Sequence, residues 1–221
     1  PGSTTGTGGI VSLADNSKII NCVNSRDMFF ASMGSGGIVA TARNNTLING
    51  CVNKCKLTCS DSAFEMYYDF AGIVSIISSS TVSYCQNEGL VEWGKAGIVG
   101  YAEDNSLIEH CDNFGLIYTR NGKNGGIVGC VDYSTIRNCS NTAYVGPEPE
   151  SGDSSCNSVG GIVGNIINES TISDCTNSGD ITGSSYVGGI VGSRNGYTVE
   201  NCTNSGTITG DSYYGDISGD D

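Results

Sequence analysis

Short apolar segments recur along the whole chain, separated by polar residues and glycine. Each recurring unit contains Gly-Ile-Val, then Ile-x-x-Cys-x-Asn with Val for Ile in two units, and then a variant of x-Ile-x-Gly. Each segment is only about three to five residues long, which is too short for a helix, and β-branched residues dominate. The pattern therefore predicts short strands joined by tight turns.

Seven of these units align on a cysteine that has an asparagine two positions after it. The cysteines are Cys22, Cys51, Cys85, Cys111, Cys139, Cys175 and Cys202. The asparagines are Asn24, Asn53, Asn87, Asn113, Asn141, Asn177 and Asn204. Successive cysteines are 29, 34, 26, 28, 36 and 27 residues apart, so the period is about 28 residues with room for insertions. An eighth, incomplete copy reads GDISG at residues 215–219.

A unit with three short strands cannot bury its apolar side alone, but it can do so when stacked on its neighbours. We therefore expect an all-β fold, a parallel β-helix (β-solenoid) of about seven to eight coils with one ~28-residue repeat per coil. Residues 1–221 would form a single domain of such repeats. At the usual strand spacing of ~4.8 Å, the stack would be roughly 35 Å long.

In such a stack each column of the repeat becomes a ladder that runs along the axis. Cysteine is small and usually buried, so the cysteine column suits a tight interior position. Neighbouring rungs are close enough for disulfides, but we favour thiols packed as apolar groups. We expect the asparagines at an inward corner, where each amide gives a hydrogen bond to one coil and accepts one from the next.

The net charge and the length of the apolar segments limit the classes of partner that the chain can have. The chain has 10 basic and 23 acidic side chains and a net charge of −13, which argues against nucleic acid and anionic membrane surfaces. No apolar run approaches the ~18 residues of a membrane span. Because the sequence opens with Pro1, we expect a mature product or part of a longer chain or assembly.

The columns also resemble a known family. GGIVG at residues 125–129, 160–164 and 188–192, followed by NC.N.G.I.G, is similar to the GLUG-motif repeat. The resemblance covers nearly the whole chain. It implies a β-helical, secreted or wall-attached protein of the adhesin-like type found on bacterial surfaces and in non-catalytic regions of immunoglobulin A-cleaving metallopeptidases. It transfers no catalytic residue, because their zinc-binding His-Glu-x-x-His is absent.

Four cysteines lie outside the column: Cys55, Cys59, Cys130 and Cys156. They are either further small apolar residues or two loop disulfides, Cys55–Cys59 and Cys130–Cys156, formed in an oxidising compartment. Zinc is disfavoured, because CxxC spacing and companion histidines are lacking. We expect no metal and no cofactor.

Candidate catalytic groups are few. The sole histidine, His110, precedes a ladder cysteine in a polar column and is most simply a solvent-facing corner residue. Acidic residues fall mainly in expected turns, which Asp and Asn favour. Some parallel β-helices are polysaccharide-acting enzymes, and this stays an alternative, but we expect no catalytic residue here.

Two insertions, residues 54–70 and 142–159, lie between the third strand of a coil and the next Gly-Ile-Val. Aromatic residues gather in that segment of several coils: Phe29, Phe30, Tyr67, Tyr68, Trp93, Tyr118, Tyr186, Tyr213 and Tyr214. They either cover the flank of the tube or form a corner that binds a glycan or a host or cell-surface protein.

We therefore expect a non-enzymatic, secreted or cell-surface β-solenoid. It would present loops for binding or stack into a stalk, with neighbouring repeats or other copies end to end. A self-assembling extracellular filament is the alternative, because uncapped solenoid ends expose strand edges that invite pairing.

Overall fold

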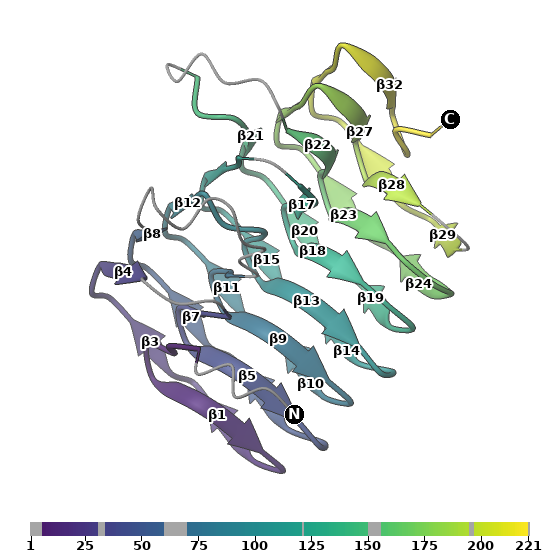
Figure 1. Cartoon of the computed structure of the whole chain (residues 1–221). Coiled ribbons are helices and arrows are strands. Elements are labelled where there is room, and N and C mark those ends of the chain that lie inside the picture. Colours follow the sequence, from purple (N-terminus) through teal and green to yellow (C-terminus); the bar gives the residue numbers. More distant parts are fainter. Residues whose placement is uncertain are drawn as a thin grey trace.

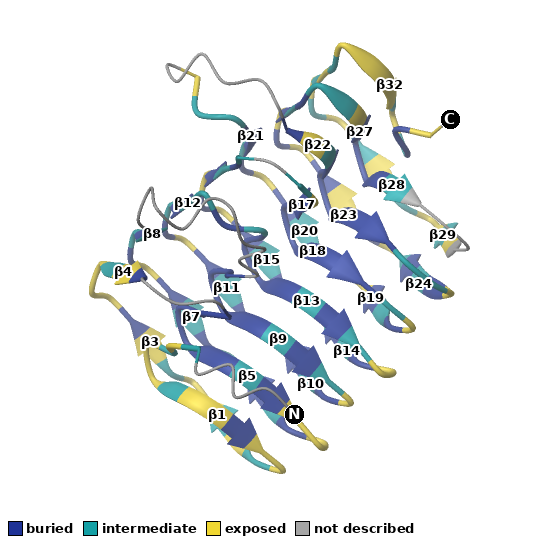
Figure 2. Cartoon of the chain, viewed as in Figure 1, coloured by how far each residue is buried: buried dark blue, intermediate teal, exposed yellow. Residues whose placement is uncertain are grey.

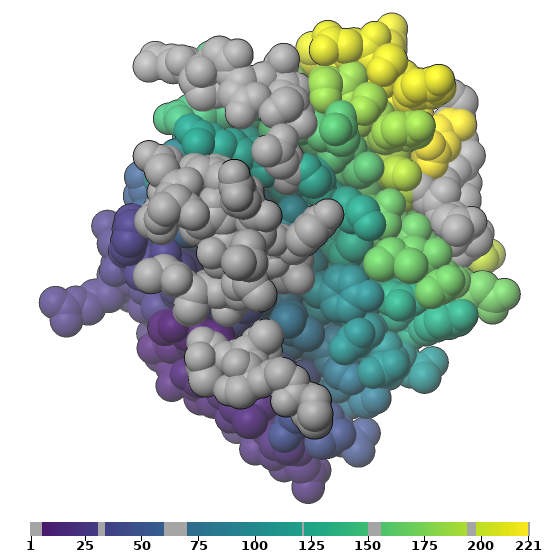
Figure 3. Space-filling model, in the orientation of Figure 1, coloured from purple at the N-terminus to yellow at the C-terminus, as the bar shows by residue number. Residues whose placement is uncertain are grey.

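The computed structural model describes residues 6–30, 34–59, 70–120, 122–149, 156–194 and 197–220. Within these ranges every regular element is a strand, and the chain winds as a parallel β-helix whose seven coils run from the N-terminal to the C-terminal end (Figure 1). In the space-filling view the coils follow one another as bands from purple to yellow (Figure 3). The predicted fold class is thus confirmed.

Four sheets of seven strands each run the length of the stack, and every strand pairs in parallel with its counterpart in the next coil. The first sheet contains β1 (Val11–Asp15), β5 (Val39–Arg43), β9 (Val74–Ser78), β13 (Val99–Glu103), β18 (Val128–Val131), β23 (Val163–Ile166) and β28 (Val191–Arg194). The second contains β2 (Lys18–Ile20), β6 (Leu47–Asn49), β10 (Thr81–Ser83), β14 (Leu107–Glu109), β19 (Thr135–Arg137), β24 (Ser170–Ser173) and β29 (Tyr197–Glu200).

The third and fourth sheets complete the wall of each coil. The third contains β3 (Val23–Asn24), β7 (Val52–Asn53), β11 (Gln86–Asn87), β15 (Asp112–Asn113), β20 (Ser140–Asn141), β25 (Thr176–Asn177) and β30 (Thr203–Asn204). The fourth contains β4 (Met28–Phe30), β8 (Leu57–Cys59), β12 (Val91–Glu92), β16 (Ile117–Tyr118), β21 (Val145–Gly146), β26 (Ile181–Thr182) and β31 (Ile208–Thr209). A fifth sheet of four strands joins the later coils: β17 (Asn124–Gly125), β22 (Asn157–Gly160), β27 (Ser185–Gly188) and β32 (Ser212–Gly215).

The expectation of three strands per coil is wrong, because the Ile-x-x-Cys-x-Asn segment is two strands. The residue before each ladder cysteine has a left-handed backbone, with φ of 53° at Asn21 and 52° at His110, and this bends the chain between the second and third sheets. The other members of this corner column are Gly50, Tyr84, Asn138, Asp174 and Asn201, all with positive φ.

The register follows the sequence columns. Ile19 pairs with Ile48, and Asn24 pairs with Asn53, as do their counterparts up the stack. Like side chains therefore lie above one another, so that a column of the repeat becomes an axial row.

Two hydrophobic cores fill the tube. The larger lies inside the first two sheets and includes the valines and isoleucines of Gly-Ile-Val and the ladder cysteines. The smaller lies inside the fourth and fifth sheets, around residues such as Leu57, Val91, Ile117 and Val159. Each ladder asparagine follows a cysteine of the first core and precedes an apolar residue of the second along the chain, so the asparagine column lies between the two.

The fifth sheet explains the glycine that follows Gly-Ile-Val in the sixth and seventh coils. A Cβ added to Gly164 would lie 2.4 Å from the backbone nitrogen of Asn124, and one added to Gly192 would lie 2.6 Å from the carbonyl carbon of Ser158. The fifth-sheet chain thus runs too close to the first sheet for a side chain. In the first three coils Ser12, Ala40 and Ser75 take the same position, and the described residues there contribute no strand to this sheet.

The end coils leave their core residues partly open. Ile10 is 47% exposed, whereas its counterpart Ile38 in the second coil is fully buried. At the other end Val199, Cys202 and Ile217 are only partly buried. Figure 2 shows the contrast between the buried strands β9, β13 and β18 and the exposed parts of β1 and β32. A core residue is fully buried only when its coil has a neighbouring coil on each side.

Candidate functional site

The asparagine column forms a hydrogen-bonded ladder through six coils. The side-chain amide of Asn53 donates to Oδ1 of Asn87 at 2.8 Å, and Asn87 donates to Asn113 at 2.8 Å. The same bond joins Asn113 to Asn141, Asn141 to Asn177, and Asn177 to Asn204, at 2.7 to 2.8 Å. The predicted exchange of hydrogen bonds from coil to coil is confirmed for these residues.

Each ladder amide also fixes the turn that follows it. The second N–H of Asn87 donates to the carbonyl of Gly89 at 2.9 Å, and that of Asn113 donates to Gly115 at 3.0 Å. Asn87 and Asn113 are fully buried, so their amide groups depend on these protein partners.

The glycine before Ile-Val is the counterpart of the ladder. A Cβ on Gly97 would lie 2.3 Å from Oδ1 of Asn113, and one on Gly72 would lie 2.4 Å from Oδ1 of Asn87. The asparagine side chain therefore packs directly on a bare backbone. The Gly and Asn columns of the repeat are two halves of one contact.

The ladder ends at its N-terminal side in a different arrangement. The amide of Asn24 donates to the carbonyl of Gly37 at 2.8 Å. In place of a hydrogen bond from Asn24, Oδ1 of Asn53 accepts one from the Sγ of Cys55 at 2.8 Å. Cys55 occupies the position that is Gly89 or Gly115 in later coils, so its thiol is a buried local partner of the ladder.

The cysteine column is a second interior ladder. The Sγ of Cys111 lies 3.3 Å from the carbonyl of Glu109 in its own coil and 3.7 Å from that of Val82 in the coil before. Burial raises the pKa of the Cys111 thiol well above its usual value. Inner rungs are buried, whereas Cys22 and Cys202 at the two ends are partly exposed.

All eleven cysteines are described, and the structure has them as thiols. The two loop disulfides considered above, Cys55–Cys59 and Cys130–Cys156, are therefore not formed in it. Cys130 lies on β18 with Nδ2 of Asn165 3.8 Å from its sulfur, whereas Cys156 packs in the smaller core and accepts a hydrogen bond from the Thr119 hydroxyl at 2.9 Å. Cys55 and Cys59 are both buried in that smaller core.

A third ladder, made of hydroxyl groups, was not foreseen from the sequence. The backbone N–H of Ser80 donates to Oγ of Ser106 at 3.3 Å, and the N–H of Ser106 donates to Oγ of Ser134 at 3.1 Å. Each hydroxyl returns a bond to a carbonyl of its own turn, as Ser106 does to Glu103 at 2.7 Å. The signal was a Ser or Thr two positions before the β-branched residue in the first six units.

Among the described residues, the predicted aromatic side chains do not form one continuous corner. Phe30 is 2% exposed and packs on Phe70 with ring centres 5.6 Å apart, so its assignment to a binding corner is wrong. Phe29, the next residue along the same strand, points outward and is 67% exposed. Tyr67 and Tyr68 lie outside the described residues.

The remaining aromatics fall in two groups. In the middle of the stack the Arg120 guanidinium lies 4.3 Å from the centre of the Trp93 ring, and Tyr118 meets Tyr144 edge to face at 6.4 Å. At the C-terminal end Tyr186 and Tyr213 stack at 5.0 Å, beside the exposed Tyr214. Of the insertions, only residues 54–59, 70, 142–149 and 156–159 are described.

His110 lies at the predicted outer corner, where its ring stacks on Tyr84 with centres 4.8 Å apart. Within the described ranges no three His, Cys, Asp or Glu side chains form a group suited to a metal ion. In those ranges there is also no helix that is long and apolar enough to cross a bilayer.

Comparison with known proteins identifies the repeat unit. The family model described as the GLUG motif matches residues 155–182 and 183–209. These two segments run from just before β22 to the end of β26 and from just before β27 to the end of β31, so one motif corresponds to one coil. No curated protein and no solved structure matches the chain. The sixth and seventh coils are thus GLUG motifs, and the five earlier coils carry the same Gly-Ile-Val and Cys-x-Asn columns.

Proposed function

We propose that this chain is a non-enzymatic structural module of an extracellular protein, secreted or attached to the cell surface. Its coils form a stiff spacer within a stalk or adhesin-like assembly, and its flank carries side chains that meet a partner. The coarser statement, a repeat structural protein with a β-solenoid fold, follows directly from the sheets and the GLUG motifs.

The observation that carries the proposal is the continuity of the interior ladders. Asn53 to Asn204 are joined by one unbroken series of side-chain hydrogen bonds, which crosses every coil–coil interface between them. Because each coil contacts mainly its neighbours, such a ladder resists sliding or bending between coils. A spacer that holds a partner at a fixed distance needs this property.

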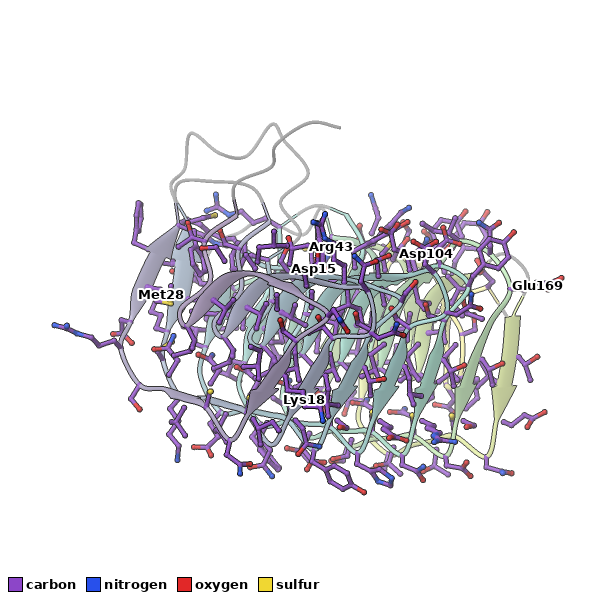
Figure 4. The ribbon with its side chains drawn as sticks, turned by 90° about the horizontal axis from the view of Figure 1, so that it is seen from below. Asp15, Lys18, Met28, Arg43, Asp104 and Glu169 are labelled. Carbon is purple, nitrogen blue, oxygen red and sulfur yellow. The ribbon has the colours of Figure 1, made fainter. Side chains whose placement is uncertain are left out.

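The outer surface carries charged side chains that face solvent, as an exposed location requires. Arg43 and Asp15 form an ion pair at 2.9 Å between the first two coils (Figure 4), and Arg137 and Glu109 form another at 2.7 Å. The net charge of −13 keeps the molecule soluble and disfavours polyanionic partners.

A second candidate, a self-assembling filament, is favoured by one observation. The end coils expose core residues such as Ile10 in the same register as the buried rungs of the inner coils. A further coil placed on either end would bury them, whichever polypeptide supplies it.

Sedimentation velocity over a concentration series, followed by electron microscopy, separates the two candidates. For a spacer module the sedimentation coefficient stays constant, and antibodies raised against the chain label intact cells of the source organism. Concentration-dependent growth into unbranched fibres would favour the filament. Labelling only after cell lysis would contradict an extracellular role.

A further inference from the structure

We propose that a notch at the corner between the first and second sheets binds a neutral saccharide. The notch has a volume of about 470 Å³ and is lined by residues of the fourth, fifth and sixth coils, including Asn105, Tyr133, Thr135, Arg137, Glu169 and Thr171. This volume is within the usual range for small-ligand sites. Glu169 lies toward the C-terminal end of the stack (Figure 4).

The notch arises from turn length. Ala102, Val131 and Ile166 are in register in the first sheet, and Leu107, Thr135 and Thr171 are in register in the second. The fourth and sixth coils connect these positions with four residues, 103–106 and 167–170, whereas the fifth uses three, 132–134. The shorter turn of the fifth coil therefore lies between two longer ones.

The walls of the notch are held by hydrogen bonds between coils. The backbone N–H of Asn105 donates to the carbonyl of Tyr133 at 2.8 Å, and the amide of Asn168 donates to the Asp132 carboxylate at 2.8 Å. The hydroxyl ladder of Ser106, Ser134 and Ser170 fixes the chain beneath. The turns are thus preorganised, which lowers the entropic cost of binding.

The lining has the chemistry of a sugar site. Tyr133 is held at a φ of 44° and is 53% exposed, so its ring offers an apolar face to a pyranose. The hydroxyls of Thr135 and Thr171 and the carboxylate of Glu169 supply acceptors and donors for sugar hydroxyls.

The charges favour a neutral ligand over an acidic one. The one cation among the lining residues, Arg137, donates two hydrogen bonds to Oε2 of Glu109 at 2.7 and 2.9 Å, which offsets its charge. Glu169 adds a negative charge, and the chain as a whole is strongly acidic.

A peptide is a poorer fit than a saccharide. Peptides that bind sheets usually add a strand to a free edge. Here β19 at the floor of the notch is paired on both sides, with β14 and β24, so the backbone there has no free edge. Among the lining residues only Leu107 and Tyr133 offer large apolar side chains.

Titration calorimetry and NMR test the site with defined probes: cellohexaose, mannohexaose, maltohexaose and galactohexaose, with hexagalacturonate as the acidic counterpart. We expect at least one neutral hexasaccharide to bind and to shift the amide resonances of residues 132–135 and 169–171. Replacing Tyr133 with Ala should weaken that binding about tenfold, and Thr171→Val should weaken it less. Tyr84→Ala, which removes a similarly exposed tyrosine at another corner, should leave that binding unchanged.

Absence of binding by all four neutral probes would overturn the proposal, as would tighter binding of hexagalacturonate. Binding that Tyr133→Ala leaves intact, or resonance shifts confined to other residues, would also overturn it. Circular dichroism and thermal unfolding of each variant establish that the coils are intact. The inference specifies a partner for the proposed flank, but its measurements use the isolated chain, so failure here is distinct from failure of the spacer role.

Discussion

The side-chain amide nitrogen of Asn87 lies 2.8 Å from Oδ1 of Asn113, its counterpart in the next coil, and both side chains are fully buried. An amide has both donors and an acceptor, so a stack of identical asparagines can satisfy itself along the axis and still cap a turn in each coil. The buried polar side chains thus link one coil to the next.

Replacing Asn113 with Ala should lower the free energy of unfolding by about 2–4 kcal/mol, because it leaves buried polar groups of Asn87, Asn141 and Gly115 without their partner. Urea denaturation measures the change. Asn204→Ala is the matched control: the last rung is partly exposed, so its loss should cost about 1 kcal/mol. Equal costs at the two positions would argue against a ladder that acts through burial.

The Gly–Asn contact predicts a coupling between two substitutions. Gly97→Ala should destabilise the fold by about 2 kcal/mol, because the new Cβ would lie 2.3 Å from Oδ1 of Asn113. In an Asn113→Ala background the same change should cost less, because one of its clashes is gone. A double-mutant cycle measures this, and strict additivity would contradict the contact.

The hydroxyl ladder predicts that Ser106→Ala costs about 1–2 kcal/mol, because the N–H of Ser80 loses its buried acceptor. Thermal unfolding is the readout. Ser205→Ala, in the partly exposed last coil, serves as the control and should be nearly neutral. A neutral Ser106→Ala would mean that the hydroxyls merely fill space.

The buried thiols predict a loss of stability at alkaline pH. Burial raises the pKa of Cys55 from 9.0 to about 11. The unfolded chain therefore loses this proton first, and the free energy of unfolding should fall as pH rises from about 9 to about 11. In Cys55→Ala this part of the decline should disappear, as denaturation curves across that pH range will reveal. Identical pH profiles for the two proteins would rule out Cys55 as a source.

Much of this architecture could be predicted from the sequence, because the main interior positions of the repeat recur in seven units. An asparagine stands two positions after each of the seven ladder cysteines, and an Ile or Val stands three positions before each. These two columns left few alternatives to a stacked β-helix. The hydroxyl column holds in six of the seven units, but Ser and Thr are common in turns and therefore mark this column only weakly.

Other features depend on contacts that no column specifies. The corner column that contains Asn21 and His110 holds residues ranging from glycine to tyrosine. The sequence therefore gave no sign of the bend that divides one expected strand into two. Phe29 and Phe30 are chemically alike, and only the alternation of the strand sends one outward and the other into the core. The notch at Tyr133 arises from a one-residue difference between neighbouring turns, which matters only once the coils are in register.

The most direct test of the central claim, that one GLUG motif is one coil of a structural stack, is to insert a second copy of residues 183–209 directly after residue 209. Urea denaturation of this longer chain should give a higher free energy of unfolding and a larger m-value, because the added coil makes one more complete set of ladder contacts. A chain with the same 27 residues in scrambled order is the control. If the intact and scrambled insertions gave the same stability as the original chain, the coil would not be the unit of the stack, and the proposed spacer role would fall with it.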